Sequence, residues 1–162
     1  MRKYKSIIFL VLVIISCFAL DIVTKTIANN ALIEYEKNGI INNFFYLTLC
    51  YNTGGAWSIF SGNVIMLIII SLVALGFVIY TIIKSNTQFY KYSSAVFIGG
   101  LLGNLYDRIV YGKVIDFLDF IIFGYDFPVF NIADCFICVG VALMLIAVIR
   151  EEKDNGKQSV QN

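Results

Sequence analysis

The stretch that decides the fold is NVIMLIIISLVALGFVIYTII, residues 63–83, which holds no charged side chain and ends next to Lys84. A helix of roughly 20 apolar residues spans the ~30 Å hydrocarbon core of a bilayer. The stretch therefore predicts a transmembrane helix and indicates a membrane protein.

Three further uncharged runs predict three more spans. They cover residues 6–20, 92–106 and 135–149 and are shorter than a spanning helix needs, so we extend them across their polar flanks. We expect four transmembrane helices, at about 6–27, 63–83, 93–112 and 131–150. Residues 1–150 would then form one membrane domain, and residues 151–162 a polar, disordered cytoplasmic tail.

The composition excludes several function classes. The 162 residues are 59% hydrophobic, and 12 Lys and Arg nearly balance 11 Asp and Glu, so no basic surface suggests nucleic acid. The chain has no histidine, which argues against Ser-His-Asp and Cys-His catalysis and against most zinc sites. Carboxylates, lysines and thiols remain as candidate reactive groups.

The distribution of positive charge predicts the orientation, because cytoplasmic segments are enriched in Lys and Arg. With the N-terminus inside, eight such residues lie inside and four outside. The inner ones are Arg2, Lys3, Lys5, Lys84, Lys91, Arg150, Lys153 and Lys157, and the outer ones Lys25, Lys37, Arg108 and Lys113. We expect both termini in the cytoplasm.

The cysteines leave two alternatives open. MRKYK followed by an apolar run that ends at Cys17 is similar to a lipoprotein signal sequence, whose cleavage would remove the first span. We favour a retained span, because the helical pattern continues past Cys17 through Ile22 and Val23. Cys135 and Cys138 form a C-x-x-C that could be a redox pair, but it has no second pair for a metal and we interpret it as structural.

The segment between the first two spans, residues 38–63, predicts short strands on the outer surface. Polar and apolar residues alternate in FFYLTLCYN, residues 44–52, and Gly54 and Gly55 indicate a turn. Trp57 suits the interfacial aromatic belt. The predicted fold class is an all-α membrane protein, with four transmembrane helices and a small extracytoplasmic β-rich segment between helices 1 and 2.

Polar residues converge at the predicted outer ends of three spans. Those in the helices are Asp21, Asn104, Asp107, Arg108, Asn131 and Asp134, and the outer loops add Asn52, Asp116, Asp119 and Asp126. Charged groups are costly next to lipid, so this clustering suggests a site. Catalysis and ion translocation both remain possible uses of it.

Helical spacing predicts how some of these residues pair. Asp21 and Lys25 stand at i and i+4, so they share a helix face and form an ion pair. We interpret Asp107 beside Arg108 as another structural ion pair. Just below this polar level, residues 95, 99 and 103 form a small-xxx-small ladder that allows a neighbouring helix to approach closely.

Asn131 is placed to cap the fourth helix, which puts Asp134 near its third position, where the helix dipole favours an ionised carboxylate. If Asp116 folds back to share this site, the two carboxylates share one proton and activate a water. The alternative role for any single aspartate is helix capping. Asp119 and Asp126 have no matching polar cluster, so we expect them to be solvated.

Five ordered motifs resemble those of bacterial lipoprotein signal peptidase, also called signal peptidase II. They are DIVTK (21–25), YNTGGAW (51–57), GGLLGNLYDR (99–108), VIDF (114–117) and FPVFNIAD (127–134). The match runs over about residues 6–150. Two departures are Gly55, where the family usually has alanine, and Cys135, where a small polar residue is common.

The resemblance implies a membrane aspartyl endopeptidase that cuts prolipoproteins before their diacylglyceryl-modified cysteine. Its catalytic pair would be Asp116 and Asp134. The residues that support the site or bind substrate would be Asp21, Lys25, Asn52, Gly54, Asn104, Arg108 and Asn131.

This function needs no metal or organic cofactor, and its partners would be prolipoprotein substrates and membrane lipid. We expect a monomer in the bacterial cell membrane, with the site near the outer face. Residues 120–130 would form a membrane-surface flap. The rival hypothesis is a small proton-coupled transporter or channel subunit, in which Asp21, Asp107 and Asp134 relay protons.

Overall fold

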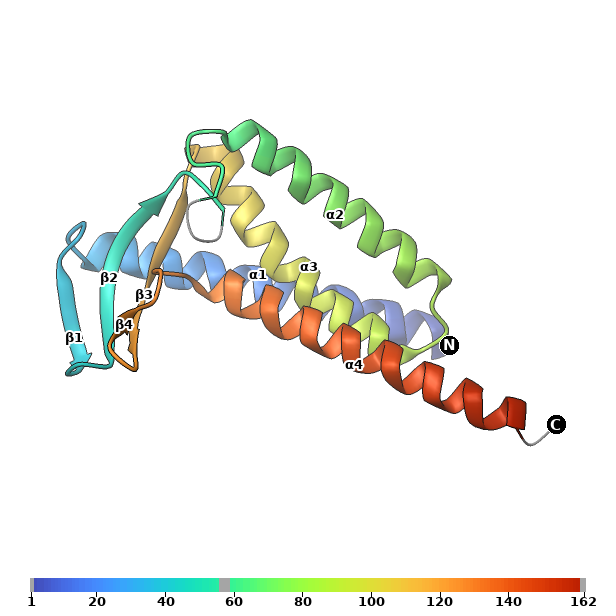
Figure 1. Ribbon diagram of the computed structural model, residues 1–162. Coiled ribbons are helices and arrows are strands. Elements are labelled where there is room, and N and C mark those ends of the chain that lie inside the picture. Colours follow the sequence, from blue (N-terminus) through green and yellow to red (C-terminus); the bar gives the residue numbers. More distant parts are fainter. Residues whose placement is uncertain (1, 56–58, 161–162) are drawn as a thin grey trace.

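The computed structural model describes residues 2–55 and 59–160. Trp57, which we expected in the interfacial aromatic belt, lies outside the described residues. Within this part the chain forms four helices and one four-stranded sheet (Figure 1). The helices are α1 (Arg2–Ala31), α2 (Val64–Lys84), α3 (Gln88–Tyr111) and α4 (Ile132–Val160), and the strands β1 (Lys37–Ile41), β2 (Phe45–Asn52), β3 (Val114–Ile122) and β4 (Tyr125–Asp126).

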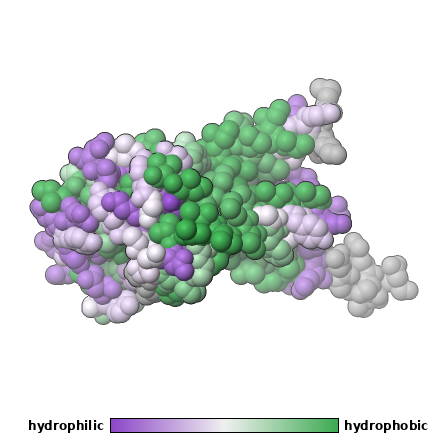
Figure 2. Space-filling view, turned by 90° about the horizontal axis from the view of Figure 1, so that it is seen from above, coloured by the Kyte–Doolittle hydropathy of each residue, from purple (hydrophilic) through white to green (hydrophobic). Residues whose placement is uncertain are grey.

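The helices run alongside one another and the sheet lies at one end, opposite the two termini (Figure 1). Helix α3 is central and packs against α1, α2 and α4. Figure 2 shows a broad hydrophobic surface over the helices and mostly hydrophilic residues over the sheet. An apolar helical surface of this kind is typical of a membrane protein, and the sheet lies beyond it.

Three of the helices among the described residues are long and apolar enough to cross a membrane, within α1, α2 and α4. Helix α3 occupies the third predicted span but has a more polar sequence, with twelve buried residues that include Ser93, Ser94, Asn104 and Asp107. Because α3 lies among the other helices, these four polar side chains are buried in protein.

Glycines allow the close helix contacts that the small-residue ladder predicted. A Cβ on Gly99 would lie 2.5 Å from the Cβ of Cys17 on α1, and one on Gly103 would meet the Asp21 side chain. On α4, a Cβ on Gly140 would lie 2.7 Å from the Cβ of Phe97 on α3. Helices α1 and α4 therefore pack closely against α3 at these glycines.

The sheet has the antiparallel order β1-β2-β3-β4. The expectation of strands between the first two helices is confirmed by β1 and β2, but confining the β structure to that segment was wrong. Strands β3 and β4 come from residues 114–126, and β3 includes the first residues of the expected flap. VIDFLDFII is rich in β-branched and aromatic residues and pairs with β2, a long-range partner that local patterns do not reveal.

The last helix differs from the prediction at its end. Helix α4 continues to Val160, whereas we expected residues 151–162 to be disordered. Glu151, Glu152 and Lys153 are strong helix formers, so they extend the apolar helix beyond its buried part.

Candidate active site

Asp134 lies in the first turn of α4, where Asn131 caps the helix as predicted. The Asp134 amide donates to Asn131 Oδ1 at 3.0 Å, and the Asn131 amide donates to Asp134 Oδ2 at 3.1 Å. This reciprocal pair has the pattern of a capping box. It fixes the Asp134 carboxylate at the helix end.

Asp116 lies on β3 and is 3% exposed. Its carboxylate accepts hydrogen bonds from Asn131 Nδ2 at 2.6 Å and from Asn52 Nδ2 at 3.0 Å. Asn131 therefore donates to both predicted catalytic carboxylates, to Asp116 through its side chain and to Asp134 through its backbone amide. Burial and the nearby charge of Asp134 raise the pKa of Asp116 to about 7.

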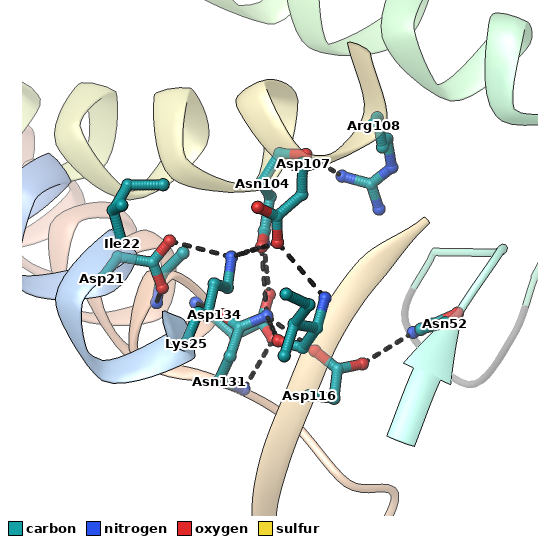
Figure 3. A network of polar contacts seen from close by, with 12 residues as sticks. Asp21, Ile22, Lys25, Asn52, Asn104, Asp107, Arg108, Asp116, Asn131 and Asp134 are labelled. Atoms are coloured by element: carbon teal, nitrogen blue, oxygen red, sulfur yellow. Dashed lines mark hydrogen bonds and ion pairs between the residues drawn. The ribbon is translucent and has the colours of Figure 1, made fainter. Parts of the chain in front are cut away.

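A buried cluster centred on Lys25 lies beside the two carboxylates (Figure 3). Lys25 Nζ is 2.8 Å from Asp21 Oδ2, as the i, i+4 spacing predicted, and 3.0 Å from Asp107 Oδ2. The expected pair of Asp107 with Arg108 was wrong. Adjacent helical residues point in different directions, so Asp107 faces α1 while Arg108 points toward the loop after β2.

Asn104 joins this cluster to Asp134. Its Oδ1 accepts from Lys25 Nζ at 2.9 Å and from Asn131 Nδ2 at 3.1 Å, and its Nδ2 donates to Asp134 Oδ1 at 2.7 Å. Because both acceptor contacts fall on Oδ1, the amide of Asn104 presents its donor to the carboxylate.

Two backbone contacts tie the same cluster to other elements. Asp21 Oδ1 accepts from the amide of Ala133 at 2.8 Å, and Asp107 Oδ2 accepts from the amide of Ile115 at 3.2 Å. Asp21 thus links α1 to α4, and Asp107 links α3 to β3. Ala133 directly precedes Asp134, so its contact with Asp21 also holds the first turn of α4, which carries Asp134. Sequence spacing did not predict this contact.

The loop after β2 supplies the remaining predicted residues. The Gly54 amide donates to Asn52 Oδ1 at 2.8 Å, which turns the chain and leaves Asn52 Nδ2 for Asp116. Arg108 donates to the carbonyl of Gly54 at 3.0 Å and to that of Asn104 at 3.3 Å. Arg108 therefore holds this loop against α3.

These residues border a cavity of about 700 Å³. Asn52, Asn104, Arg108, Asp116 and Asp134 line its polar part. Residues 127–130 and Ile137 contribute a mainly apolar wall, and Cys135 and Cys138 reach it as free thiols. The cavity combines two carboxylates with an apolar surface, which suits a substrate that has both a peptide bond and lipid chains.

The two remaining acids of this region differ from each other. Asp126 is exposed, as predicted, and its carboxylate lies 3.0 Å from Lys37 Nζ. Asp119 is fully buried, so the expectation that it is solvated was wrong. Its Oδ2 accepts from Thr48 Oγ1 at 2.7 Å and lies 3.3 Å from Lys37 Nζ. Strand pairing brings these partners to Asp119 from β1 and β2.

Comparison with known proteins agrees with this geometry. The family model described as signal peptidase (SPase) II matches residues 13–150. The chain belongs to the signal peptidase II family. As a member it is a peptidase, and its apolar helices make it a multi-pass membrane protein.

Similar members of the signal peptidase II family cover nearly the whole chain. A lipoprotein signal peptidase of Francisella tularensis subsp. novicida is 42% identical over 158 residues, which are 93% of this chain and 95% of the relative. One from Caldicellulosiruptor bescii is 39% identical over 140 residues, 86% of this chain and 90% of the relative. A solved bacterial membrane enzyme is 36% identical, with a TM-score of 0.79 over 93% of this chain and 90% of its own.

Proposed function

We propose that this chain is an aspartyl endopeptidase that removes the signal peptide from diacylglyceryl-modified prolipoproteins, by cleaving just before the lipidated cysteine. The observation that supports the aspartyl assignment is that two carboxylates from different elements, Asp116 on β3 and Asp134 on α4, line one cavity. Asn131 donates a hydrogen bond to each of them. Membership of the signal peptidase II family supports the substrate class.

The two carboxylates share one proton and hold one water between them. The ionised carboxylate takes a proton from the water, whose oxygen attacks the scissile carbonyl carbon while the other carboxyl protonates the carbonyl oxygen. The carboxyl that received the proton of the water then donates it to the leaving nitrogen of the cysteine as the C–N bond breaks. The other carboxylate takes back a hydroxyl proton of the intermediate, so the pair again holds one proton. The products are a signal peptide carboxylate and a lipidated cysteine with a free amino group.

The amide side chains prepare the carboxylates for this reaction. Asn52 and Asn131 donate to Asp116, and Asn104 donates to Asp134, so both acids keep their positions before substrate binds. Arg108 and Gly54 hold the wall against which the peptide would lie. The apolar wall of residues 127–130 would cover the lipid-bearing side of the substrate.

The proposed placement in the membrane has α3 crossing together with α1, α2 and α4. Both termini would lie in the cytoplasm and the sheet outside the cell, which puts the cavity near the outer face. A diacyl anchor would hold the cleavage site at this depth and make the encounter nearly unimolecular. One chain supplies both carboxylates and all three amides, so we expect a monomer to be active.

Buried polar groups further along the helices do not support the proton-relay alternative. Ser71, Ser93 and Ser94 each donate to a carbonyl of their own helix, four residues earlier. These bonds satisfy each hydroxyl locally, whereas a relay needs polar groups that face one another through the depth of the bundle.

The experiment that tests the function uses purified protein in detergent and a prolipoprotein with a diacylglyceryl cysteine. We expect cleavage before that cysteine, much slower cleavage of the unlipidated form, and no effect of a chelator. If the lipidated substrate stays intact under conditions in which the protein is folded, the proposed function is wrong.

A further inference from the structure

A second cavity, of about 330 Å³, adjoins the active-site cavity on the sheet. The two cavities share a wall formed by Tyr35, Cys50 and residues 127–129. Lys37, Thr48, Asp119 and Asp126 line only the second cavity. The second cavity therefore continues the first along the sheet and adds four polar side chains to it.

These four polar residues form a row that crosses the sheet. Lys37 on β1 pairs in register with Thr48 on β2, Thr48 donates to Asp119 on β3, and Lys37 also reaches Asp126 on β4. A β-bulge helps to aim Asp119. The amides of Phe117 and Leu118 both donate to the carbonyl of Phe130, and such a bulge changes the face to which later side chains point.

The charges in this row do not balance. Two carboxylates, Asp119 and Asp126, share one ammonium group, that of Lys37, which leaves one excess negative charge. Asp119 Oδ1 is buried and accepts no hydrogen bond from any residue that the structure describes. A buried carboxylate oxygen without a donor is costly, so this atom indicates a place for a donor from a ligand.

A ligand cation could reach the second carboxylate oxygen, Asp119 Oδ2, by displacing Lys37, whose Nζ lies 3.3 Å from it. The Lys37 side chain is 42% exposed and the Asp126 side chain 65% exposed, so this ion pair can move outward together. Exposed ion pairs contribute little to stability. The row would then offer Asp119 to an incoming cation while Lys37 remains paired with Asp126.

The orientation of the substrate indicates which part of it would enter the second cavity. The apolar signal peptide belongs alongside the helices, within the lipid, and the residues after the cysteine belong to the part of the lipoprotein that leaves the membrane. The sheet lies at the end of the molecule opposite the termini (Figure 1). The chain that follows the scissile bond must therefore pass over the sheet, where the second cavity lies.

We propose that the second cavity is a subsite for the first residues after the cleaved bond, and that it favours a basic side chain, Lys or Arg. This inference rests on the proposed function, because it takes the substrate and its direction from it. Asp119 would bind the cation, and Asp126 would hold Lys37 away from Asp119. Without Asp126, Lys37 would compete with the substrate cation for Asp119.

The test compares lipidated substrates that differ only in having Lys, Met or Glu at the second, third or fourth residue after the scissile bond. At one of these positions we expect kcat/KM for Lys to exceed that for Met by about fivefold, the size typical of one partly exposed ion pair, and Glu to be worse than Met. Asp126→Asn should reduce the Lys preference and Lys37→Met should increase it.

Two further variants complete this experiment. Glu36→Gln removes one exposed negative charge beside Lys37 but does not line either cavity, so it should leave the preference unchanged. Asp119→Asn should abolish the preference where the variant folds. Equal kcat/KM for Lys and Met at all three positions, or a preference that neither Asp126→Asn nor Lys37→Met changes, would overturn the subsite.

A binding measurement separates this proposal from the proposed function. Diacylglyceryl-cysteine peptides that carry Lys or Met after the cysteine should bind the Asp116→Asn protein with a similar, about fivefold, difference in Kd. If the parent protein cleaves no substrate, the proposed function fails while this difference still tests the subsite. Equal Kd values would contradict the subsite, and a water would then be the donor to Asp119 Oδ1.

Discussion

Asp116 is a carboxylate whose pKa is raised to about 7 by burial, with the nearby charge of Asp134 as the next cause. The proposed mechanism needs one proton on the pair, and raising the pH through 7 removes it. We therefore expect kcat/KM for the lipidated substrate to fall as the pH rises above about 7. A profile that stays flat to about pH 9 would contradict the role of Asp116.

The same carboxylate makes stability depend on pH. Its folded pKa lies above its ordinary value of 3.8, so between pH 4 and 7 the folded state binds more protons than the unfolded state, and stability falls as the pH rises. Asp116→Asn removes this loss. The Tm of the variant minus that of the parent should therefore increase from pH 5 to pH 8; a constant difference would show that Asp116 titrates normally.

Lys25 is the only cation within ion-pair distance of Asp21 and Asp107 among the described residues, and its side chain is 1% exposed. Lys25→Met leaves both buried carboxylates without a cation, which should lower the free energy of unfolding by about 3 to 5 kcal/mol. Chemical unfolding in detergent measures this loss. The exposed control Lys5→Met should change it by less than about 0.5 kcal/mol, and a similarly small change for Lys25→Met would contradict the network.

At this scale, local spacing predicted the contacts that lie within one helix turn. The Asp21–Lys25 pair and the Asn131 cap are confirmed, because i, i+4 and N-cap geometry follow from the helix itself. Contacts between different helices and strands were harder to predict from the sequence. The partners of Asp107 and Asp119 come from α1 and from β1 and β2, so sequence proximity suggested the wrong environment for both.

At the scale of elements, close glycine contacts position the carboxylates. Gly140→Ala would bring a Cβ to 2.7 Å from Phe97 Cβ, which should separate α4 from α3 and cost about 1 to 3 kcal/mol of stability. The matched control is Gly76→Ala on α2, where a Cβ would meet nothing within 4 Å. It should be neutral or stabilise by up to about 1 kcal/mol. Equal Tm changes for the two variants would contradict this packing.

The helices could be predicted from hydrophobic runs, whereas half of the sheet could not. Residues 63–83 predicted a helix that the structure places at Val64–Lys84. VIDFLDFII has no such decisive pattern, because its strand is buried over most of its length and pairs with residues more than sixty positions away. Asp116 therefore reaches the site on a strand that was not predicted, although its place in the catalytic pair followed from the family resemblance.

For the whole molecule, the account predicts four crossings. Reporter fusions after Ser85 and at the C-terminus should behave as cytoplasmic, and a fusion after Gly112 as external. The fusion after Gly112 is the informative one, because α3 is more polar than the other three helices. A cytoplasmic reporter at this position would contradict the crossing of α3 and the proposed outer position of the cavity, because β3, which follows Gly112, pairs with β2.

The central claim is that Asp116 and Asp134 together perform the cleavage. The most direct measurement is the rate of cleavage of a diacylglyceryl prolipoprotein by the parent, Asp116→Asn, Asp134→Asn and the surface control Glu36→Gln, each shown to be folded by its thermal unfolding transition. The account predicts cleavage by the parent and the control and loss of at least about 10³-fold in rate in each aspartate variant. Substantial cleavage by either folded aspartate variant would contradict it.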